Sequence, residues 1–423
     1  MGSYFGKESN QQEEKTTEQG STATKSNSDD DNEKEFLVHF KKAQELHQNS
    51  GKDDSQPQDS EKLLEEINLA IQAKDDVTDA FVLRGIVYRD MVALKMADPQ
   101  AQNEQLEPLV RASIDDFNAA LRVSKNQQRE PFVFLSRGMT LQLIGENQKA
   151  ISDYSRALEL LEADLPALEQ QLLKNAKKDG ADDNGGGGGV DDGNKEQILK
   201  LKQIAYGAHF NRGITFLSMA SFDDAILDLT KALKFEKFKQ GPDNLDSLSS
   251  SASSSRAETD PTIYINRAGA YLQKGSLDKA IDDYSAAIKR IEASRATPPS
   301  AATSSSSPSS AAVERNELLA AQYANRGQCY LQKKEFGCAY TDFDTCIKHF
   351  KYDLSLPKEL QSYPDNAAAG SLAATYYARR GEASLYSKKI DPAMEDFNTA
   401  IRIDPECLDA WKNRGMMFKA MGS

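Results

Sequence analysis

The chain of 423 residues carries 65 acidic and 52 basic side chains, which give a formal net charge of −13. That charge disfavours nucleic acid and anionic membrane surfaces as partners, because both attract proteins with a positive surface. The longest apolar runs, such as residues 81–83, are soon interrupted by charge and are far shorter than the roughly 18 residues that span a bilayer. The composition therefore favours a protein that binds neither nucleic acid nor membrane.

The first segment, residues 1–34, is rich in Ser, Thr, Glu, Asp and Gln. Such a segment buries too little apolar surface to offset the entropy lost on ordering, so we expect a disordered acidic and polar tail. It lacks the apolar core of a secretory signal, and Gly6 stands where N-myristoylation requires Ser or Thr. We therefore predict a cytoplasmic protein, with the nucleus as the alternative compartment.

Residues 35–75 are expected to form a degenerate N-terminal helix pair. Residues 36–48 and 61–73 both have helical patterning, and the second of these segments places its apolar residues on one side of a helix. These apolar residues are Leu63, Leu64, Ile67, Ala70 and Ile71. We interpret the pair as a cap on the first repeat.

An arginine followed by a small residue recurs seven times within apolar helical stretches. The seven pairs are Arg84-Gly85, Arg137-Gly138, Arg212-Gly213, Arg267-Ala268, Arg326-Gly327, Arg380-Gly381 and Arg414-Gly415. In the second to sixth copies, an alanine follows the small residue after 12 residues and opens a second phrase, which reads Ala-Ile-x-Asp-Tyr-x-x-Ala-Leu at residues 150–158. The two phrases predict two helices in each complete copy.

This pattern resembles the tetratricopeptide repeat, a helix pair with an aromatic residue, a Leu-Gly and a Tyr in its first helix and Ala-x-x-x-Phe in its second. Residues 411–418, which read Trp-x-x-Arg-Gly-x-x-Phe, and Ala393-x-x-x-Phe397 match this signature. Gly381 and Gly415 are separated by 34 residues, which is the period of the family. The resemblance implies an all-α fold, a right-handed superhelical array of antiparallel helix pairs.

The other copies are spaced more widely, so the chain contains long insertions between its repeats. The expected order after the N-terminal pair is repeats one and two at 77–165, a Gly/Asp-rich linker at 178–194, repeat three at 195–240, a Ser-rich linker at 241–258, repeat four at 259–293, a Ser/Pro-rich linker at 294–312, repeat five at 313–350, repeat six at 371–405, and a terminal half repeat at 406–423. In the first copy, we expect the extra residues between the two helices, around Pro99 and Pro108.

The linkers are expected to be disordered and to bulge outward without breaking the stack, because each doubling of loop length costs only about 0.6 kcal/mol. Alternatively, the longest linker, between copies two and three, acts as a hinge between two sub-arrays. Thr297-Pro298 and Ser307-Pro308 suggest phosphorylation sites, although low sequence complexity alone also explains them.

In each complete copy, an aspartate on the second helix matches the arginine on the first. The six pairs are Arg84 with Asp116, Arg137 with Asp153, Arg212 with Asp228, Arg267 with Asp283, Arg326 with Asp342, and Arg380 with Asp396. Antiparallel helices in contact at the small residue would bring these side chains within reach, so we predict an ion pair inside each repeat. Alternatively, both side chains point separately into water. A buried pair adds little net stability, and we expect it to fix the register of the two helices.

The family resemblance implies that the first helices line a concave face. Residues three before, one after and four after the small residue then point into it. This lining is strongly apolar in copies one to four, which predicts a groove for an amphipathic helix or an extended apolar peptide. The candidate binding residues are Val82, Ile86, Leu135, Met139, Phe210, Ile214, Leu217, Ile265, Leu272 and Leu331. Alternatively, the curvature of the array packs these side chains on one another.

Members of the family that bind chaperone tails carry a carboxylate clamp, which begins with a lysine three residues before the small residue. That place is apolar in every complete copy, where it holds Val82, Leu135, Phe210, Ile265, Ala324 and Ala378. Only Asn211, Asn266 and Asn325 match a later element of the clamp. A role as co-chaperone is therefore disfavoured.

No arrangement of residues suggests catalysis, a metal site or a cofactor. His39, His47, His209 and His349 are scattered, without metal-ligand spacing or a neighbouring nucleophile. Cys329, Cys338, Cys346 and Cys407 form no CxxC pair and are expected to be reduced core thiols. We predict a chain that is not an enzyme and binds no metal or cofactor.

The sequence therefore predicts a protein-protein interaction scaffold or adaptor that binds a peptide or helix of another protein in a concave groove. The partner and the oligomeric state stay open. The alternatives are a co-chaperone-type adaptor and a regulatory or targeting segment of a larger enzyme or complex. The terminal half repeat contains only a first helix, so Trp411, Met416, Met417 and Phe418 are expected either to form a cap or to await a partner helix.

Overall fold

A computed structural model describes residues 26–49, 57–96, 106–124, 130–179, 188–236, 260–296, 310–350, 352 and 364–421. The regular elements in these ranges are helices, with no strand among them, which confirms the predicted all-α class. The chain divides into two compact units. Unit 1 comprises Met1–Ser221 and Leu227–Ser254, and unit 2 comprises Phe222–Ile226 and Ser255–Ser423.

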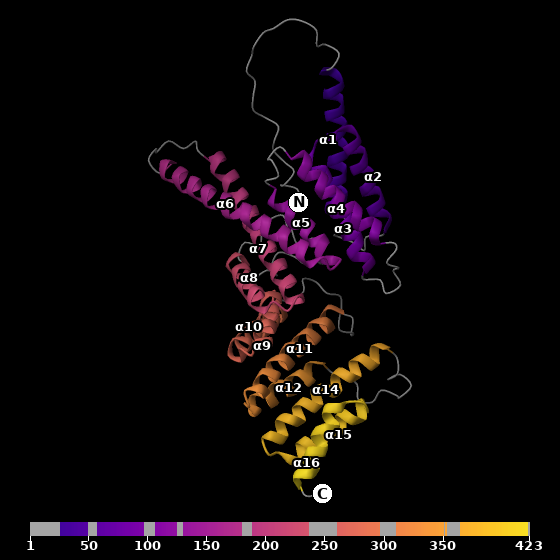
Figure 1. Ribbon diagram of the computed structural model, residues 1–423, viewed down its shortest axis with the longest axis vertical. Coiled ribbons are helices and arrows are strands. Elements are labelled where there is room, and N and C mark those ends of the chain that lie inside the picture. The colour runs from indigo at the N-terminus through magenta and orange to yellow at the C-terminus, as the bar shows by residue number, and fades with distance from the viewer. Residues whose placement is uncertain are drawn as a thin grey trace. The chain divides into compact units, whose positions relative to one another are not determined.

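Unit 1 is built from helix pairs in chain order (Figure 1). The pairs are α1 (Ser26–Asn49) with α2 (Pro57–Ala73), α3 (Thr78–Met96) with α4 (Leu106–Val123), and α5 (Pro131–Leu143) with α6 (Asn147–Asp179), and α7 (Gly188–Ser218) packs along α6. Each second helix also contacts the first helix of the next pair, so apolar side chains are buried both within and between pairs.

Unit 2 repeats this arrangement (Figure 1). Its pairs are α9 (Thr262–Gln273) with α10 (Leu277–Ala296), α11 (Ser310–Gln332) with α12 (Phe336–Phe350), and α14 (Pro364–Tyr386) with α15 (Ile390–Ile403), followed by α16 (Leu408–Met421). Helix α8 (Phe222–Phe235) contributes residues to both units. The division of the chain therefore falls within repeat three.

Several helices extend into segments that were expected to be tail or linker. Helix α1 begins at Ser26, inside the predicted tail. Helices α6 and α7 continue to Asp179 and from Gly188, inside the predicted 178–194 linker. An ion pair between Lys202 and Glu169, with 2.7 Å from Nζ to Oε1, joins α7 to α6 outside this segment.

Other helix boundaries also differ from the predicted ones. Helices α10 and α11 run to Ala296 and from Ser310, inside the predicted 294–312 linker, and α14 begins at Pro364. Pro108 lies in the first turn of α4 rather than in a connection, which is a position where proline removes no helical hydrogen bond. The predictions for Gly6, Pro99, Thr297-Pro298 and Ser307-Pro308 concern residues outside the described ranges.

The turn between the two helices of a repeat has the same form in five copies, and this explains the constant 12-residue spacing. Each turn contains one residue with positive φ, which closes the first helix with hydrogen bonds to its last carbonyl groups. This residue is Gly145, Ala220, Gly275, Lys334 or Lys388. Glycine adopts such a conformation without steric cost, whereas the alanine and the two lysines accept some strain.

Candidate partner-binding surface

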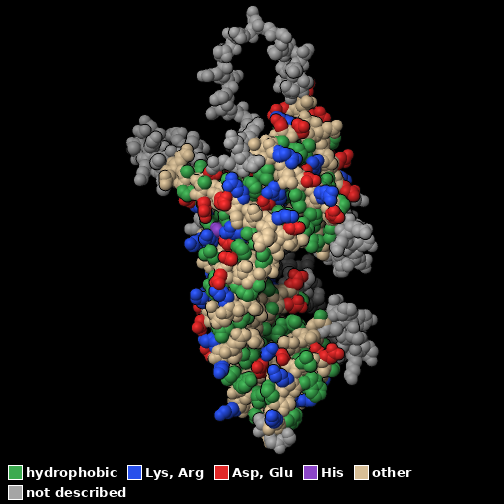
Figure 2. Space-filling model, in the orientation of Figure 1, with side chains coloured by type: hydrophobic (Ala, Val, Ile, Leu, Met, Phe, Trp, Pro, Cys, Tyr) green, Lys and Arg blue, Asp and Glu red, His purple; other side chains and the backbone are tan. Residues whose placement is uncertain are grey.

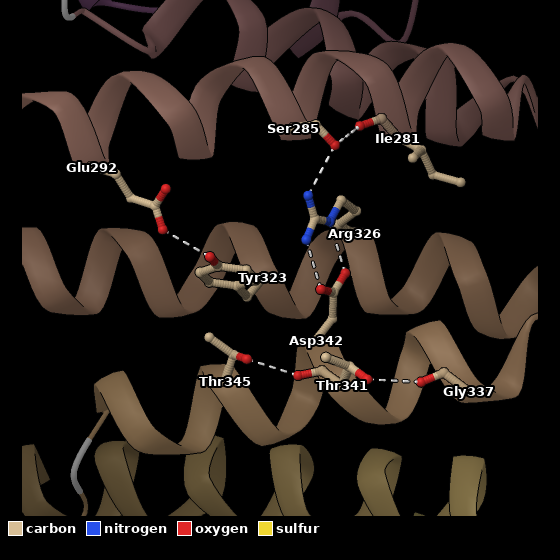
Figure 3. A network of polar contacts seen from close by, with 9 residues as sticks. All are labelled: Ile281, Ser285, Glu292, Tyr323, Arg326, Gly337, Thr341, Asp342 and Thr345. Carbon is tan, nitrogen blue, oxygen red and sulfur yellow. Dashed lines mark hydrogen bonds and ion pairs between the residues drawn. The ribbon is translucent and has the colours of Figure 1, made fainter.

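The arginine of every complete repeat is bound by the aspartate of the same repeat. Figure 3 shows Arg326, whose Nε and Nη2 donate to Oδ2 and Oδ1 of Asp342 at 2.8 and 2.7 Å. The same two-bond geometry joins Arg84 to Asp116, Arg137 to Asp153, Arg212 to Asp228, Arg267 to Asp283, and Arg380 to Asp396. Two parallel bonds between planar groups fix both distance and orientation. Each pair therefore holds its two helices in one register.

A third bond from the same guanidinium reaches the preceding repeat. Arg326 Nη1 donates to Ser285 Oγ at 2.9 Å (Figure 3), and Ser285 lies two residues after the aspartate of repeat four. The corresponding bonds join Arg84 to Asn68, Arg137 to Asn118, Arg212 to Ser155, Arg380 to Asp344, and Arg414 to Asn398. The arginine thus ties neighbouring repeats together as well as the helices of its own repeat. Sequence reasoning missed this contact, although the acceptor always stands at the same place.

An aromatic ring three residues before the arginine supports the other side of the guanidinium. The Arg326 guanidinium carbon lies 5.3 Å from the Tyr323 ring centroid. Comparable contacts pair Arg84 with Phe81, Arg137 with Phe134, Arg267 with Tyr264, Arg380 with Tyr377, and Arg414 with Trp411. In repeat three this place is held by His209, which bonds Asp228 instead. The hydrogen bonds that Arg326 donates to Asp342 raise the pKa of Arg326 despite the opposing effect of burial, so this cation is kept charged.

The N-terminal pair contains a variant of this arrangement. Glu66 on α2 stands two residues before Asn68, the acceptor of Arg84, and so occupies the aspartate place. Its carboxylate accepts from His39 Nδ1 at 2.8 Å and from Lys42 Nζ at 2.5 Å on α1. These hydrogen bonds, first that of His39 and then that of Lys42, outweigh burial and lower the pKa of Glu66. The N-terminal pair thus holds a buried carboxylate at the aspartate place of the repeat, bound by a histidine and a lysine instead of an arginine.

Three of the predicted groove residues in unit 1 are closed off from solvent. Val82, Ile86 and Leu135 are at most 2 % exposed and belong to one apolar cluster with α7 side chains such as Ile204. Close packing of α5 on α7 is the reason, since a Cβ added at Gly207 would lie 3.2 Å from Leu135 Cδ2. The prediction that these three side chains face an open groove is corrected, because the first helices pack on one another here.

The other predicted residues differ in their exposure. Leu331 is 9 % exposed and lies in the apolar cluster of α11, α12 and α14, so it too is part of the core. Half-buried positions remain at Met139, Phe210, Ile214, Leu217, Ile265 and Leu272. Within unit 1, Phe210, Ile214 and Leu217 form a row along one side of α7, because they are spaced by four and three residues.

The cysteines do not all lie in the core. Cys329 and Cys346 are buried, but Cys338 is exposed and Cys407 is half-buried, so the expectation of four core thiols is wrong for Cys338. Burial raises the pKa of Cys329 to about 11, which keeps its thiol protonated at neutral pH. No group of His, Cys, Asp and Glu within the described ranges could hold a metal ion.

Comparisons with known proteins identify the family. The family model described as "Tetratricopeptide repeat" matches residues 261–293 and 374–407, which correspond to α9 with α10 and to α14 with α15. These two matches fall on helix pairs that carry the arginine-aspartate arrangement. The chain contains tetratricopeptide repeats. Repeats of this family form surfaces for protein interaction, and the chain is an interaction scaffold of this type.

One solved structure of TM-score above 0.5 agrees with the fold, and a second comparison scores lower. The apo form of RapI is 13% identical, with 90% of this chain and 82% of that chain covered and a TM-score of 0.52. The C-terminal part of a TPR repeat-containing protein from Cytophaga hutchinsonii is 12% identical, with coverage of 89% and 98% and a TM-score of 0.47. No curated protein matches the chain. None of the helices in the described part of this tetratricopeptide repeat protein combines the length and apolar character that crossing a membrane requires.

Proposed function

We propose that the chain is a non-catalytic adaptor that binds a peptide or an amphipathic helix of another protein on the inner face of its first helices. The observation that carries this proposal is that the residues of a first helix that bind neighbouring helices are not the residues that stay partly exposed. The arginine of each repeat engages the second helix and the preceding repeat, whereas the row on α7 takes no part in these bonds. The arginine contacts hold the helix in place, and the half-buried apolar side chains of the row stay available to a ligand.

Phe210, Ile214 and Leu217 are the proposed anchors in unit 1. Their spacing presents three apolar side chains on one stripe, the arrangement that helix-binding surfaces use to engage a partner. Phe210 is held in place by Tyr206, whose ring stacks on it with centroids 6.0 Å apart. In unit 2, Ile265 and Leu272 on α9 occupy the same places and are proposed as a second, separate row of anchors.

The energetics suit a transient partner. Full burial of one such side chain contributes about 1.5 to 3 kcal/mol of transfer free energy. Three anchors together contribute about 4.5 to 9 kcal/mol, and the entropy lost on association offsets part of this sum, so the affinity from these contacts should be no tighter than micromolar, about −8 kcal/mol. Affinity of this size favours exchange between partners over a permanent complex.

A peptide selection tests this proposal without knowledge of the natural partner. Random 16-residue peptides displayed on phage are selected on the wild-type chain, on Phe210→Glu and on Leu94→Glu, which places a charge at a 70 % exposed leucine of α3. We expect the wild type and Leu94→Glu to enrich the same apolar sequences, and Phe210→Glu to lose them. Equal enrichment by all three proteins, each checked for native helicity, would count against the inner-face site.

The co-chaperone alternative finds no support at the positions that would hold an acidic tail, because the lysine place is apolar in each complete repeat. Nothing observed favours the regulatory-segment alternative over a free-standing adaptor, and the peptide selection applies equally to both.

A further inference from the structure

Helix α16 has one packed face and one bare face. Ala410, Asn413 and Met417 are buried, at 0 %, 7 % and 1 % exposure, and α16 packs on both α14 and α15. On another side, Leu408, Trp411 and Phe418 are 80 %, 46 % and 40 % exposed and lie on one stripe with Gly415. In Figure 2, hydrophobic side chains reach the surface at the end of unit 2 where α16 lies.

The same stripe is covered one repeat earlier. The residues of α14 that lie 34 positions before Leu408, Gly415 and Phe418 are Ala374, Gly381 and Ser384. All three are buried, the alanine and the serine at 0 % exposure, and α15 packs on α14. The bare stripe of α16 is therefore the face that a second helix occupies in a complete repeat.

The space beside Gly415, at the centre of this stripe, differs from the space beside the matching glycines of complete repeats. A Cβ added at Gly381 would lie 2.8 Å from Cε1 of Phe397 on α15, and one added at Gly85 would lie 3.0 Å from Cε1 of Phe117 on α4. A Cβ added at Gly415 would meet nothing within 4 Å. The place of a large apolar side chain beside Gly415 is thus open in the described part of the chain.

Arg414, next to Gly415, makes only part of the contacts that the arginines of complete repeats make. Arg414 keeps the bond to the preceding repeat, with Nη1 2.8 Å from Asn398 Oδ1, and it keeps its aromatic support, with its guanidinium carbon 4.4 Å from the Trp411 ring centroid. Within the described ranges, no carboxylate pairs with it, although Arg84, Arg137, Arg212, Arg267, Arg326 and Arg380 each hold two bonds to an aspartate. The positive charge of Arg414 therefore favours a ligand that brings a carboxylate to this place.

We propose that α16 is a docking site for one amphipathic helix of a partner polypeptide. The six complete repeats define its chemistry: an aspartate for Arg414, then an aromatic residue or leucine for the space beside Gly415, with small residues three before and four after the aspartate. This pattern is shared by α4, α6, α8, α10, α12 and α15. The site uses none of the proposed inner-face anchors, so this proposal does not depend on them and is tested separately.

The chain supplies both a probe and a reporter for this site. The probe is a synthetic peptide of residues 389–404, which contains the α15 sequence with Asp396 and Phe397 and has no tryptophan. The reporter is Trp411, which is the only tryptophan of the chain and is 46 % exposed on the bare stripe. Docking of the peptide on the 423-residue chain should shift the Trp411 emission to shorter wavelength, because the indole loses contact with water.

Matched variants distinguish specific docking of the peptide on α16 from nonspecific binding. Asp396→Asn in the peptide or Arg414→Gln in the protein should each weaken binding at least about tenfold, as expected for the loss of a charge-assisted hydrogen bond. The two changes together should cost little more than either alone. Gly415→Leu, which fills the open space, should abolish the shift, whereas Lys412→Gln on the same helix should leave it unchanged.

Two results would overturn the proposal. One is the absence of an emission shift at about 1 mM peptide, or a shift that Arg414→Gln and Gly415→Leu do not alter. The other is a wild-type chain that sediments as a dimer and becomes monomeric with Gly415→Leu, since a second copy would then cover the stripe. Far-ultraviolet circular dichroism of each variant shows that the fold is retained, which the exposed location of the stripe leads us to expect.

Discussion

His209 Nδ1 lies 2.9 Å from Oδ1 of Asp228, so in repeat three a histidine binds the aspartate that otherwise serves the arginine alone. The other complete repeats place an aromatic ring at this position, beneath the guanidinium. Both side chains are buried, and Arg212 donates two further bonds to the same carboxylate. The aspartate of repeat three thus has one more side-chain hydrogen-bond partner than the aspartates of the repeats with an aromatic ring at this position.

This contact predicts an acid-sensitive contribution to stability. Burial alone would raise the pKa of Asp228, but the hydrogen bonds and charges of Arg212 and His209 outweigh it and lower the pKa. A carboxyl with a lowered pKa in the folded state stabilises the fold above its unfolded pKa of about 4, and this stabilisation is lost as the pH falls through the lowered value. The thermal midpoint of the wild type should therefore fall more between about pH 6 and pH 3 than that of Asp228→Asn. Asp224→Asn, an exposed change on the same helix, should follow the wild type; parallel curves for all three proteins would disprove the assignment.

The paired arginine and aspartate predict unequal effects of single and double substitution. Arg137→Ala leaves Asp153, which is 6 % exposed, without its cation and should cost about 3 to 5 kcal/mol of unfolding free energy. Arg137→Met with Asp153→Leu removes both charges and fills their volume, so it should be much milder. Thermal or urea unfolding of the variants measures the difference. Equal destabilisation by the single and the double change would refute a register role for the pair.

Two glycines predict opposite responses to alanine. A Cβ at Gly138 would lie 2.7 Å from Tyr154 Cε1, so Gly138→Ala must push the ring away and should destabilise by about 1 to 3 kcal/mol. Gly269 also lies inside a first helix, but a methyl group added there would meet nothing within 4 Å, so Gly269→Ala should stabilise by about 0.5 to 1 kcal/mol through helix propensity. Unfolding midpoints that move in the same direction for both would contradict this packing.

The helix pairs and their arginine-aspartate contacts could be predicted because the residues that form them recur with the same letters at the same spacing. The bond from a guanidinium to the preceding repeat could not be predicted in this way. Its acceptors are Asn68, Asn118, Ser155, Ser285, Asp344 and Asn398, which share a place in the repeat but not a residue type. A search for repeated residues overlooks a position where any side-chain oxygen suffices.

The burial of the predicted groove residues escaped prediction for a different reason. Periodicity places Leu135 and Phe210 on the same face of their helices, but it does not report how closely the next helix approaches. Close approach of α7 buries Leu135 at 2 % exposure, whereas Phe210 stays half-buried. How closely neighbouring first helices approach, which many small contacts determine together, decides which apolar residues remain available.

The most direct test of the account is the affinity of one selected peptide for two single variants, measured by isothermal titration calorimetry. Ile214→Glu places a charge in the centre of the α7 row, and Leu94→Glu adds the same charge at an exposed site of unit 1. The account predicts that Ile214→Glu weakens binding by at least about tenfold, or 1.4 kcal/mol, while Leu94→Glu retains the wild-type Kd. Unchanged binding by Ile214→Glu, in a protein that keeps its native helicity, would contradict the claim that the inner face of this tetratricopeptide repeat protein binds its partners.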